Sequence, residues 1–182
     1  MRVYEIELQD LSPAAVAGCG SALMTDPGVA PDSLGDWWQC WEGLAGLSDG
    51  RQWTGFVQAA PGWPLVAEME REPGTELIVP VDRPIVQVIA PASPAGEARP
   101  DAKAARAILV RPGTALVMAP GVWHAAAFGG NAAAAYFYIA ERRRAEDSEG
   151  RGGWVALADG MQIRCHPPQA AATEGRISPD ER

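Results

Sequence analysis

The sequence has few of the residues that usually mark a thiol or histidine-rich metal centre, with three cysteines and two histidines in 182 residues. Cys19, Cys40 and Cys165 form no C-x-x-C pair, and their odd number is typical of reduced intracellular thiols. The chain also lacks an N-terminal apolar run after a basic start, and any stretch approaching the roughly 20 apolar residues that a membrane span needs. We therefore expect a cytoplasmic protein without a signal peptide.

Basic side chains are also scarce, because 15 Lys and Arg stand against 23 Asp and Glu, which gives a net charge of −8. No basic stripe is present, so the composition argues against nucleic acid as a partner. The arginines at 142–144 are followed closely by Glu146, Asp147 and Glu149, a mixture typical of a solvated turn. A small-molecule ligand is the expected partner.

The chain has no internal repeat, so a duplicated barrel is not expected. Its 16 prolines and 20 glycines are spread along the sequence, and 47% of the residues are hydrophobic. This distribution divides the chain into many short elements and favours an all-β fold. The length predicts one domain over residues 1–166 with a sizeable core, followed by an Ala- and Pro-rich C-terminal tail over 167–182.

Local patterns predict the individual elements. Residues 2–8 are expected to form an edge-type strand, and Ser12-Pro13 resembles a cap that starts a short helix over 14–17. Further strands are expected, separated in many places by Gly, Pro or Asp, at 53–59, 65–71, 76–80, 85–90, 106–110, 114–118 and 134–140.

Tryptophans gather in the first third of the chain. Trp37, Trp38 and Trp41 would share part of one helix face, which is typical of a core or dimer-contact cluster. The alternative is an aromatic wall beside a ligand site. Because such a cluster is a liability when exposed, we expect a homodimer. Trp123 is expected to pack on the outside of the barrel or at an interface.

Two segments carry the most specific pattern. Residues 64–80 and 111–124 each contain a short strand and a Gly turn, with acids or a lone histidine nearby. Glu70-x-Glu72-x-x-x-Glu76 has the spacing of a cupin metal motif with Glu where His is usual, and Pro120-Gly121 precedes His124. The pair predicts an all-β fold, a single cupin (jelly-roll type) β-barrel with a few short helices.

The blocks that surround these segments resemble the ureidoglycolate lyase (ureidoglycolate hydrolase) family. The matching stretches are 58–65, 68–73, 74–80, 106–109 and 121–124. The chain departs from the family at Glu72 and Ala119, where histidines are usual, and at Ala125-Ala126, where His-Pro is usual. The resemblance implies a cupin-fold homodimer that cleaves a carbon–nitrogen bond of ureidoglycolate and releases urea and glyoxylate.

The candidate site is rich in carboxylates. On a strand, Glu68, Glu70 and Glu72 lie on one face, and like charges brought together in a barrel need a cation or a protonated member. One imidazole with oxygen ligands suits Mn²⁺, Fe²⁺, Ni²⁺ or Mg²⁺. The expected metal ligands are Glu70, Glu72, Glu76 and His124. The alternatives are solvent-facing glutamates and a buried, hydrogen-bonded His124.

Three functions fit this pattern. In a carbon–nitrogen lyase, Glu70, Glu72 and His124 would be catalytic, with Arg106 and Glu68 binding the substrate. The second is a metal-dependent isomerase or dioxygenase for another small acid, and the third is a non-catalytic, ligand-binding cupin. The expected cofactor is a divalent metal such as Ni, Mn or Fe, or none.

Overall fold

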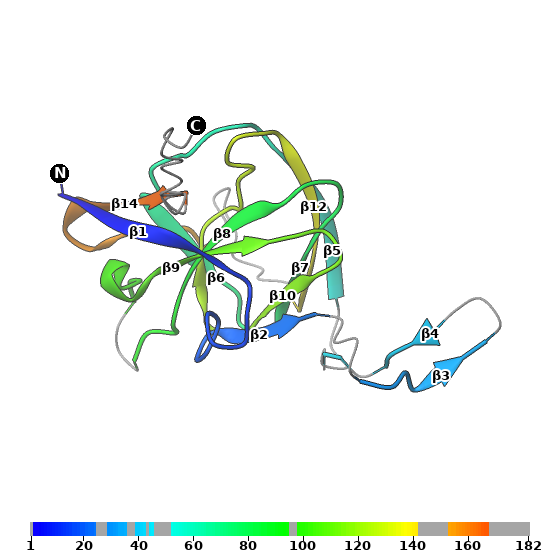
Figure 1. Ribbon diagram of the computed structural model, residues 1–182. Helices are drawn as coiled ribbons and strands as arrows, with labels where there is room; N and C mark the ends of the chain where they lie inside the picture. The colour runs from blue at the N-terminus through cyan, green and yellow to red at the C-terminus, as the bar shows by residue number, and fades with distance from the viewer. Residues whose placement is uncertain are drawn as a thin grey trace, which may run out of the picture.

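A computed structural model of the protein describes residues 2–24, 29–35, 39–42, 44–45, 52–94, 98–141 and 153–167. Two large β-sheets and a separate two-stranded sheet account for nearly all the regular structure within these ranges (Figure 1). Two short 3-10 helices, η1 (Ala102–Ala104) and η2 (Ala158–Gly160), complete it. The all-β prediction is confirmed.

The first sheet has seven strands, and most neighbours in it are antiparallel. Its order is β13 (Val155–Ala156), β6 (Glu68–Arg71), β11 (Trp123–His124), β8 (Ile85–Ala90), β9 (Arg106–Val110), β1 (Arg2–Asp10) and β14 (Met161–His166). Strand β1 is the exception, because it runs parallel to both β9 and β14. The expectation that β1 is an edge strand is therefore wrong, since β14 covers its second side.

The second sheet has five antiparallel strands. Its order is β2 (Gly20–Leu23), β10 (Ala115–Met118), β7 (Glu76–Pro80), β12 (Ala134–Glu141) and β5 (Gln52–Ala59). The two-stranded sheet is a hairpin of β3 (Ser33–Leu34) and β4 (Gln39–Cys40), which stands away from the rest of the molecule in Figure 1.

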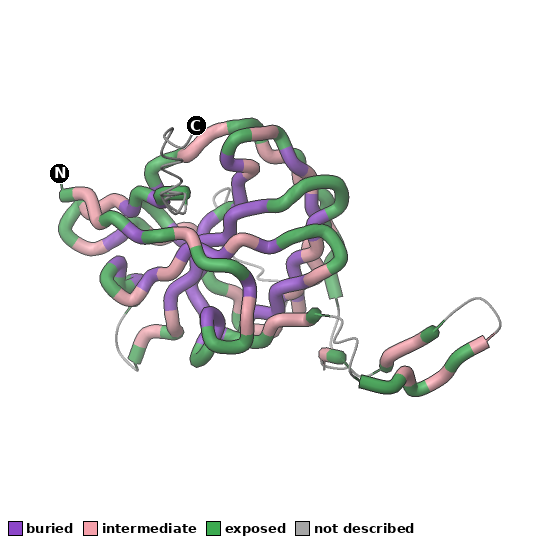
Figure 2. The backbone as a smooth tube through the Cα atoms, in the orientation of Figure 1, coloured by how far each residue is buried: buried purple, intermediate pink, exposed green. Residues whose placement is uncertain are grey.

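The core explains why the two sheets close on each other. All six residues of β8 are buried, so this strand contributes apolar side chains to both of its faces. Ile85 and Ile89 belong to a cluster that includes Leu116 and Tyr136 of the opposite sheet, which places that cluster inside the barrel. Val86 belongs to a second cluster, on the other face of the strand. Buried stretches of backbone run through the middle of the molecule in Figure 2. The prediction of a β-barrel is confirmed.

The expected helix over 14–17 is wrong, although the Ser12 signal is used. The Ser12 hydroxyl accepts a hydrogen bond from the Ala15 backbone N–H at 3.2 Å, and residues 13–19 form turns rather than an α-helix. Gly18, with φ of +76°, leads the chain back into β2. Trp37, Trp38, the arginine-rich run and the tail over 168–182 lie outside the described residues.

The cysteines have the state that their spacing predicts. All three are free, and Cys19 and Cys165 are buried. Burial raises the pKa of Cys165 to about 12, so this thiol stays protonated and unreactive at neutral pH. Within the part of the chain that the structure describes, no helix is long and apolar enough to cross a bilayer.

Candidate acid–base site

Three strands bring Glu70, His124 and Glu76 together. His124 on β11 lies directly opposite Glu70 on β6, and paired residues of antiparallel strands place their side chains on the same face. The chain then crosses from β6 to β7 of the other sheet through the turn at Pro73-Gly74, which carries Glu76 across the barrel. The site therefore lies where the two sheets meet.

The His124 imidazole faces both carboxylates. Its Nε2 atom lies 3.2 Å from Oε2 of Glu76 and 3.7 Å from Oε1 of Glu70. The nearer oxygen is within hydrogen-bonding distance, and both carboxylates contribute to the raised pKa of the ring. The side chains are 5% exposed for His124, 10% for Glu76 and 20% for Glu70, so solvent reaches the group from the Glu70 side.

The backbone fixes how this ring is presented. Nδ1 of His124 lies 3.4 Å from the carbonyl oxygen of Val122, and a carbonyl oxygen can only accept a hydrogen bond. When Nδ1 carries a proton for this carbonyl, Nε2 is the ring nitrogen that faces the carboxylates of Glu70 and Glu76, which are also hydrogen-bond acceptors. Both ring nitrogens can donate a hydrogen bond when the ring is an imidazolium, with Nδ1–H directed at the Val122 carbonyl and Nε2–H directed at Glu76.

The electrostatics agree with a protonated ring. Burial lowers the pKa of His124, but the carboxylates of Glu70 and Glu76 raise it by more, so the pKa lies above its ordinary value of 6.5. Below this raised pKa, a charged imidazolium is paired with two carboxylates. Such a group can give a proton from one member and take a proton on another.

We expect Glu76→Gln to lower the pKa of His124, because the nearer negative charge is lost while the shape is kept. Since folding raises this pKa, the stabilisation from the protonated ring is complete below pH 6.5 and is lost as the pH rises through the raised value. The Glu76→Gln protein should therefore lose less folding stability over this pH range than the wild-type protein. NMR titration of the imidazole measures the pKa, and an unchanged pKa of His124 would contradict the assignment.

Tyr136 is a site residue that the sequence analysis missed. It is buried on β12, and this burial raises the pKa of its phenol. A hydrogen bond with the Ala127 backbone lowers the pKa, whereas the charges of Glu76 and Glu70 raise it further. The net pKa lies above the ordinary value of 10, so the phenol keeps its proton beside the carboxylates. Tyr136 and Tyr138 are two residues apart on a strand, a spacing that places both on the face toward the site.

A glycine makes room for the second tyrosine. Gly55 of β5 lies opposite Tyr138 of β12. A Cβ atom at position 55 would lie 2.2 Å from Cε1 and 2.6 Å from the hydroxyl of Tyr138. The ring of Tyr138 therefore lies over the backbone of β5, and this placement requires glycine there.

Gln87 is a second polar residue that the pattern did not indicate. It is fully buried on β8, on the face that Ile89 shares with His124. Its Nε2 donates to the carbonyl oxygen of Ala125 at 2.6 Å, which holds the residue that follows His124. Its Oε1 has no hydrogen-bond partner among the described residues. One amide thus steadies the end of β11.

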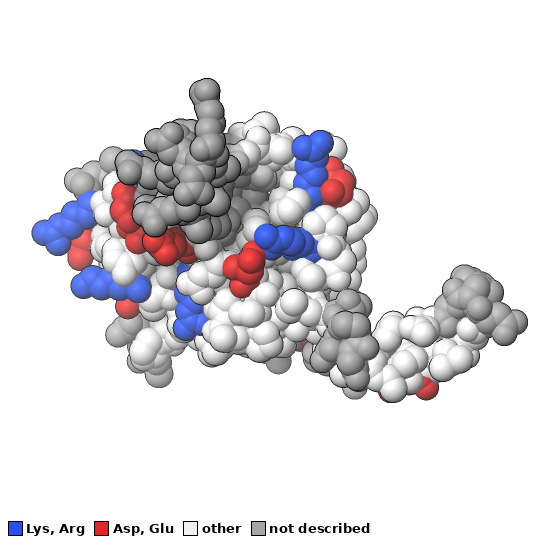
Figure 3. Space-filling view, viewed as in Figure 1, with Lys and Arg blue, Asp and Glu red and all other residues white. Residues whose placement is uncertain are grey.

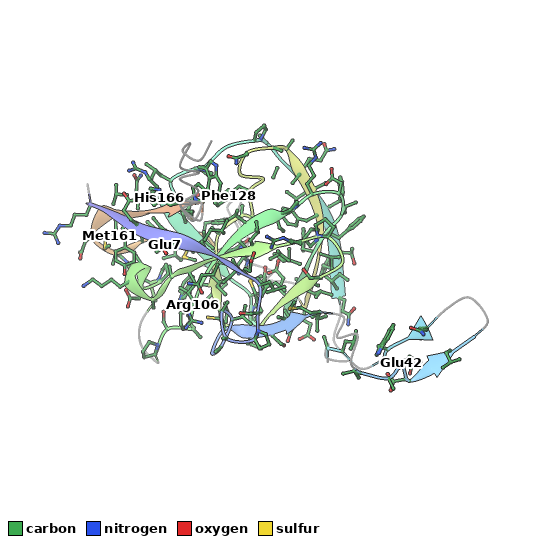
Figure 4. The ribbon with its side chains drawn as sticks, in the orientation of Figure 1. Glu7, Glu42, Arg106, Phe128, Met161 and His166 are labelled. Atoms are coloured by element: carbon green, nitrogen blue, oxygen red, sulfur yellow. The ribbon has the colours of Figure 1, made fainter. Side chains whose placement is uncertain are left out.

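The structure places the other predicted site residues in different surroundings. Glu72 follows β6, is half-buried, and its carbonyl accepts a hydrogen bond from the Gly121 N–H at 2.8 Å, which ties the two motif segments together. Glu68 is exposed at the start of β6, opposite Ala156. Arg106 donates from Nη1 to the carbonyl oxygens of Ala15 and Ala17, at 3.1 and 2.7 Å, so that nitrogen braces a turn (Figure 4).

The described residues contain no group of three or more His, Cys, Asp or Glu side chains arranged to hold a metal ion. The donor types at the site still suit a hard divalent cation, since His124 contributes nitrogen and two glutamates contribute oxygen. An ion would have to replace the direct contact between the imidazole and Glu76. The ligand set Glu70, Glu72, Glu76 and His124 stays a prediction.

No protein-family model and no curated protein matches this chain. Among solved structures it is similar to oxalate decarboxylase from Lactobacillus farciminis in complex with formate, with a TM-score of 0.40 and 11% identity over 59% of this chain and 27% of that chain. It is also similar to RmlC from Streptococcus suis in complex with dTDP-D-xylose, with a TM-score of 0.39 and 13% identity over 54% and 47% of the two chains. The matched part is less than half of either structure, and similarities at these TM-scores support no conclusion about activity.

Proposed function

We propose that the protein is a carbon–nitrogen lyase that cleaves ureidoglycolate, or a related small carboxylate, into urea and glyoxylate. The observation that carries the proposal is the contact between His124 Nε2 and Glu76 Oε2 at 3.2 Å, with Glu70 beside them. This reaction needs one group that takes a proton and another that gives one. The resemblance of the blocks around residues 70 and 124 to the ureidoglycolate lyase family supports the same reaction.

The chemistry assigns one role to each type of group. A carboxylate, Glu70 or Glu76, removes the proton of the substrate hydroxyl, and the oxygen forms the carbonyl of glyoxylate. The bond between carbon and nitrogen breaks, its electron pair stays on nitrogen, and the imidazolium of His124 protonates the departing urea. The glutamic acid then returns its proton to His124 through their direct contact, which restores the starting state.

The surroundings favour a substrate that donates hydrogen bonds. The carboxylates of Glu70 and Glu76 are acceptors, which match the N–H and O–H groups of a hydroxylated urea derivative. The substrate carboxylate needs a cation or other strong donors. Arg106 remains the proposed residue, and it would have to use nitrogens other than the Nη1 that binds Ala15 and Ala17.

The decisive experiment is an assay of urea and glyoxylate release from ureidoglycolate by the purified protein, with and without added Ni²⁺ and Mn²⁺. We expect release of both products in equal amounts, above the spontaneous rate in buffer. A rate equal to that of buffer under all metal conditions would overturn the proposal.

A metal-dependent enzyme for another small acid is the second candidate, favoured by the approach of one imidazole and two carboxylates within 3.7 Å. In that case Glu70, Glu76 and His124 would hold the cation, which would polarise the substrate. Metal content measured after purification tests it, with His124→Ala as the comparison. Stoichiometric metal that His124→Ala loses, together with no urea release, would favour this candidate over the lyase.

A further inference from the structure

A β-bulge lies in the chain immediately after β11. The Ala125 N–H donates to the carbonyl oxygen of Val88. Two residues further along β8 toward its start, Val86 exchanges both of its backbone hydrogen bonds with Phe128. Between these contacts one residue, Gln87, lies on β8, and two residues lie on the opposite chain segment. Bulges of this kind occur often beside active sites, where they change the direction of a side chain.

The bulge decides which side of the sheet the neighbouring side chains face. His124 pairs with Ile89 and shares its face, which points into the barrel. Phe128 pairs with Val86, and both belong to the cluster on the other face. Residues four apart on a regular strand face the same side, so without the extra residue either His124 or Phe128 would be turned to the wrong face. The place of the imidazole beside its carboxylates therefore depends on the bulge.

The side chain of Gln87 holds the bulge from β8. Its Nε2 donates to the carbonyl oxygen of Ala125 at 2.6 Å and to that of Val88 at 3.3 Å, so the amide nitrogen faces two acceptors. Its Oε1 is left buried without a partner among the described residues, which is unfavourable. A methionine of similar length would avoid this cost. The support of the bulge, rather than the stability of the core, therefore explains why glutamine occupies this position.

Tyr136 reaches the bulge from the opposite sheet. It is buried on β12 and belongs to the cluster inside the barrel. The backbone of Ala127 lowers the pKa of its phenol, which is the effect of an N–H that donates to the phenol oxygen. The bulge is thus held on two sides, by an amide from β8 and by a phenol from β12.

Ion pairs at the surface offer no comparable support. Figure 3 shows basic and acidic side chains beside one another on the face in view. In the part of the chain that the structure describes, the pairs Arg111–Asp10 and Arg164–Glu5 join side chains that are about half exposed or more, and neither pair includes a residue of β8 or β11. Exposed pairs of this kind contribute little to stability. The direction of His124 therefore depends on hydrogen bonds inside the barrel.

We propose that Gln87 and Tyr136 are positioning residues, which hold the bulge and thereby direct the His124 imidazole toward Glu76. Neither residue needs to touch the substrate for this role. Nε2 of His124 now lies 3.2 Å from Oε2 of Glu76, and proton transfer between the two groups requires that contact. The role rests on the proposed function only where kcat is concerned.

Proton NMR of the His124 ring tests this role without an assay of activity. At a pH between the ordinary pKa values of glutamate and histidine, about 4.3 and 6.5, the imidazole is charged, and an Nε2–H held against a carboxylate gives a resolved downfield resonance. His166→Ala serves as the parent protein for all variants, because it leaves His124 as the one imidazole of the chain. We expect Gln87→Met to lose this resonance and Tyr136→Phe to weaken it.

Gln162→Met is the matched control. Gln162 also has a buried Oε1 without a partner in the described ranges, but it lies on β14 beside Val3 of β1. The control should keep the resonance. Circular dichroism should show that Gln87→Met is folded like the parent protein.

An unchanged resonance in Gln87→Met would overturn the role of Gln87, and absence of the resonance from the parent protein would overturn the proposal as a whole. Equal loss of the resonance in the control would also contradict it. An unfolded Gln87→Met protein would do the same, since the glutamine would then serve the core. An unchanged resonance in Tyr136→Phe would overturn the role of the tyrosine alone.

In the proposed lyase reaction, Gln87→Met should lower kcat by about 10²-fold with little change in KM, the scale expected when a reacting group is misplaced by about 1 Å. Gln162→Met should keep the wild-type kcat. An active wild-type enzyme with an unchanged kcat in Gln87→Met would overturn the effect on turnover. A wild-type protein that releases no urea would contradict the proposed function, and the ring spectrum would still decide the role of Gln87.

Discussion

Replacing His124 by alanine is expected to lower kcat of the proposed lyase reaction by about 10²–10⁴-fold, the usual contribution of general acid–base catalysis. The variant loses the imidazolium that protonates the departing urea nitrogen. It also loses the imidazole that takes the proton back from the glutamic acid at the end of the reaction. Release of urea and glyoxylate measures the rate. Because His124 is buried between the two carboxylates, near-UV circular dichroism is needed to check that the variant keeps the wild-type fold.

The second histidine supplies the control. His166 is exposed at the end of β14 and contacts the carboxylate of Glu5 on the neighbouring strand, away from Glu70 and Glu76. His166→Ala should therefore retain the wild-type kcat. If His124→Ala kept full activity, or if both variants lost activity equally, the acid–base role of His124 would be wrong.

Trp123→Ala is expected to cost about 3–5 kcal/mol of the free energy of unfolding, as large-to-small changes of buried aromatic residues do. Trp123 is among the largest fully buried side chains of the protein. Its Nε1 donates to the hydroxyl of Ser93 at 2.7 Å, and the guanidinium carbon of Arg71 lies 4.6 Å from its ring centroid. Trp123 belongs with Val86 to the cluster on the outer side of the barrel, as expected, and it is buried there beneath other side chains. Denaturant unfolding followed by fluorescence measures the loss.

Two comparisons make that result specific. Trp123→Phe keeps most of the volume but loses the hydrogen bond to Ser93, so it should cost clearly less than Trp123→Ala. Trp53→Ala removes an exposed tryptophan from β5 and should change stability by less than about 0.5 kcal/mol. A Trp123→Ala protein as stable as Trp53→Ala would show that the cluster around Trp123 contributes little.

The strands could be predicted from the sequence where glycine and proline separate apolar runs. The expected segments 76–80, 85–90 and 106–110 match β7, β8 and β9 residue for residue. The spacing of the two motif segments also indicated that Glu70 and His124 would meet, which the β6–β11 register shows. The strands depend on local order, so neighbouring residues encode them. The pairing of Glu70 with His124 joins segments that are distant in the sequence, and only the matching of the two motifs indicated it.

Features that depend on distant partners could not be predicted in the same way. Nothing within residues 2–8 indicates that β14 will pair beside them. The segment 161–166 is bounded by Asp159-Gly160 and Pro167-Pro168, turn signals that the sequence analysis did not use. The position of Tyr136 beside the site also could not be predicted. Its spacing from Tyr138 places both residues on one face of a strand, but only the β12–β7 register turns that face toward Glu76. The Ser12-Pro13 pattern is found at the start of helices and of turns alike. In the structure it starts a turn, which lies against β10.

The position of β1 has a consequence for the order of folding. Its parallel partners are β9, in which Ala107 pairs with Leu8, and β14, in which Met161 pairs with Arg2. Both contacts join regions of the chain that are synthesised far apart in time, and such high contact order slows folding. During synthesis the first strand therefore waits as an open edge until most of the chain has left the ribosome. The antiparallel β8–β9 pair can form earlier, and we expect closure by β14 to be the late step that commits the barrel to its native state.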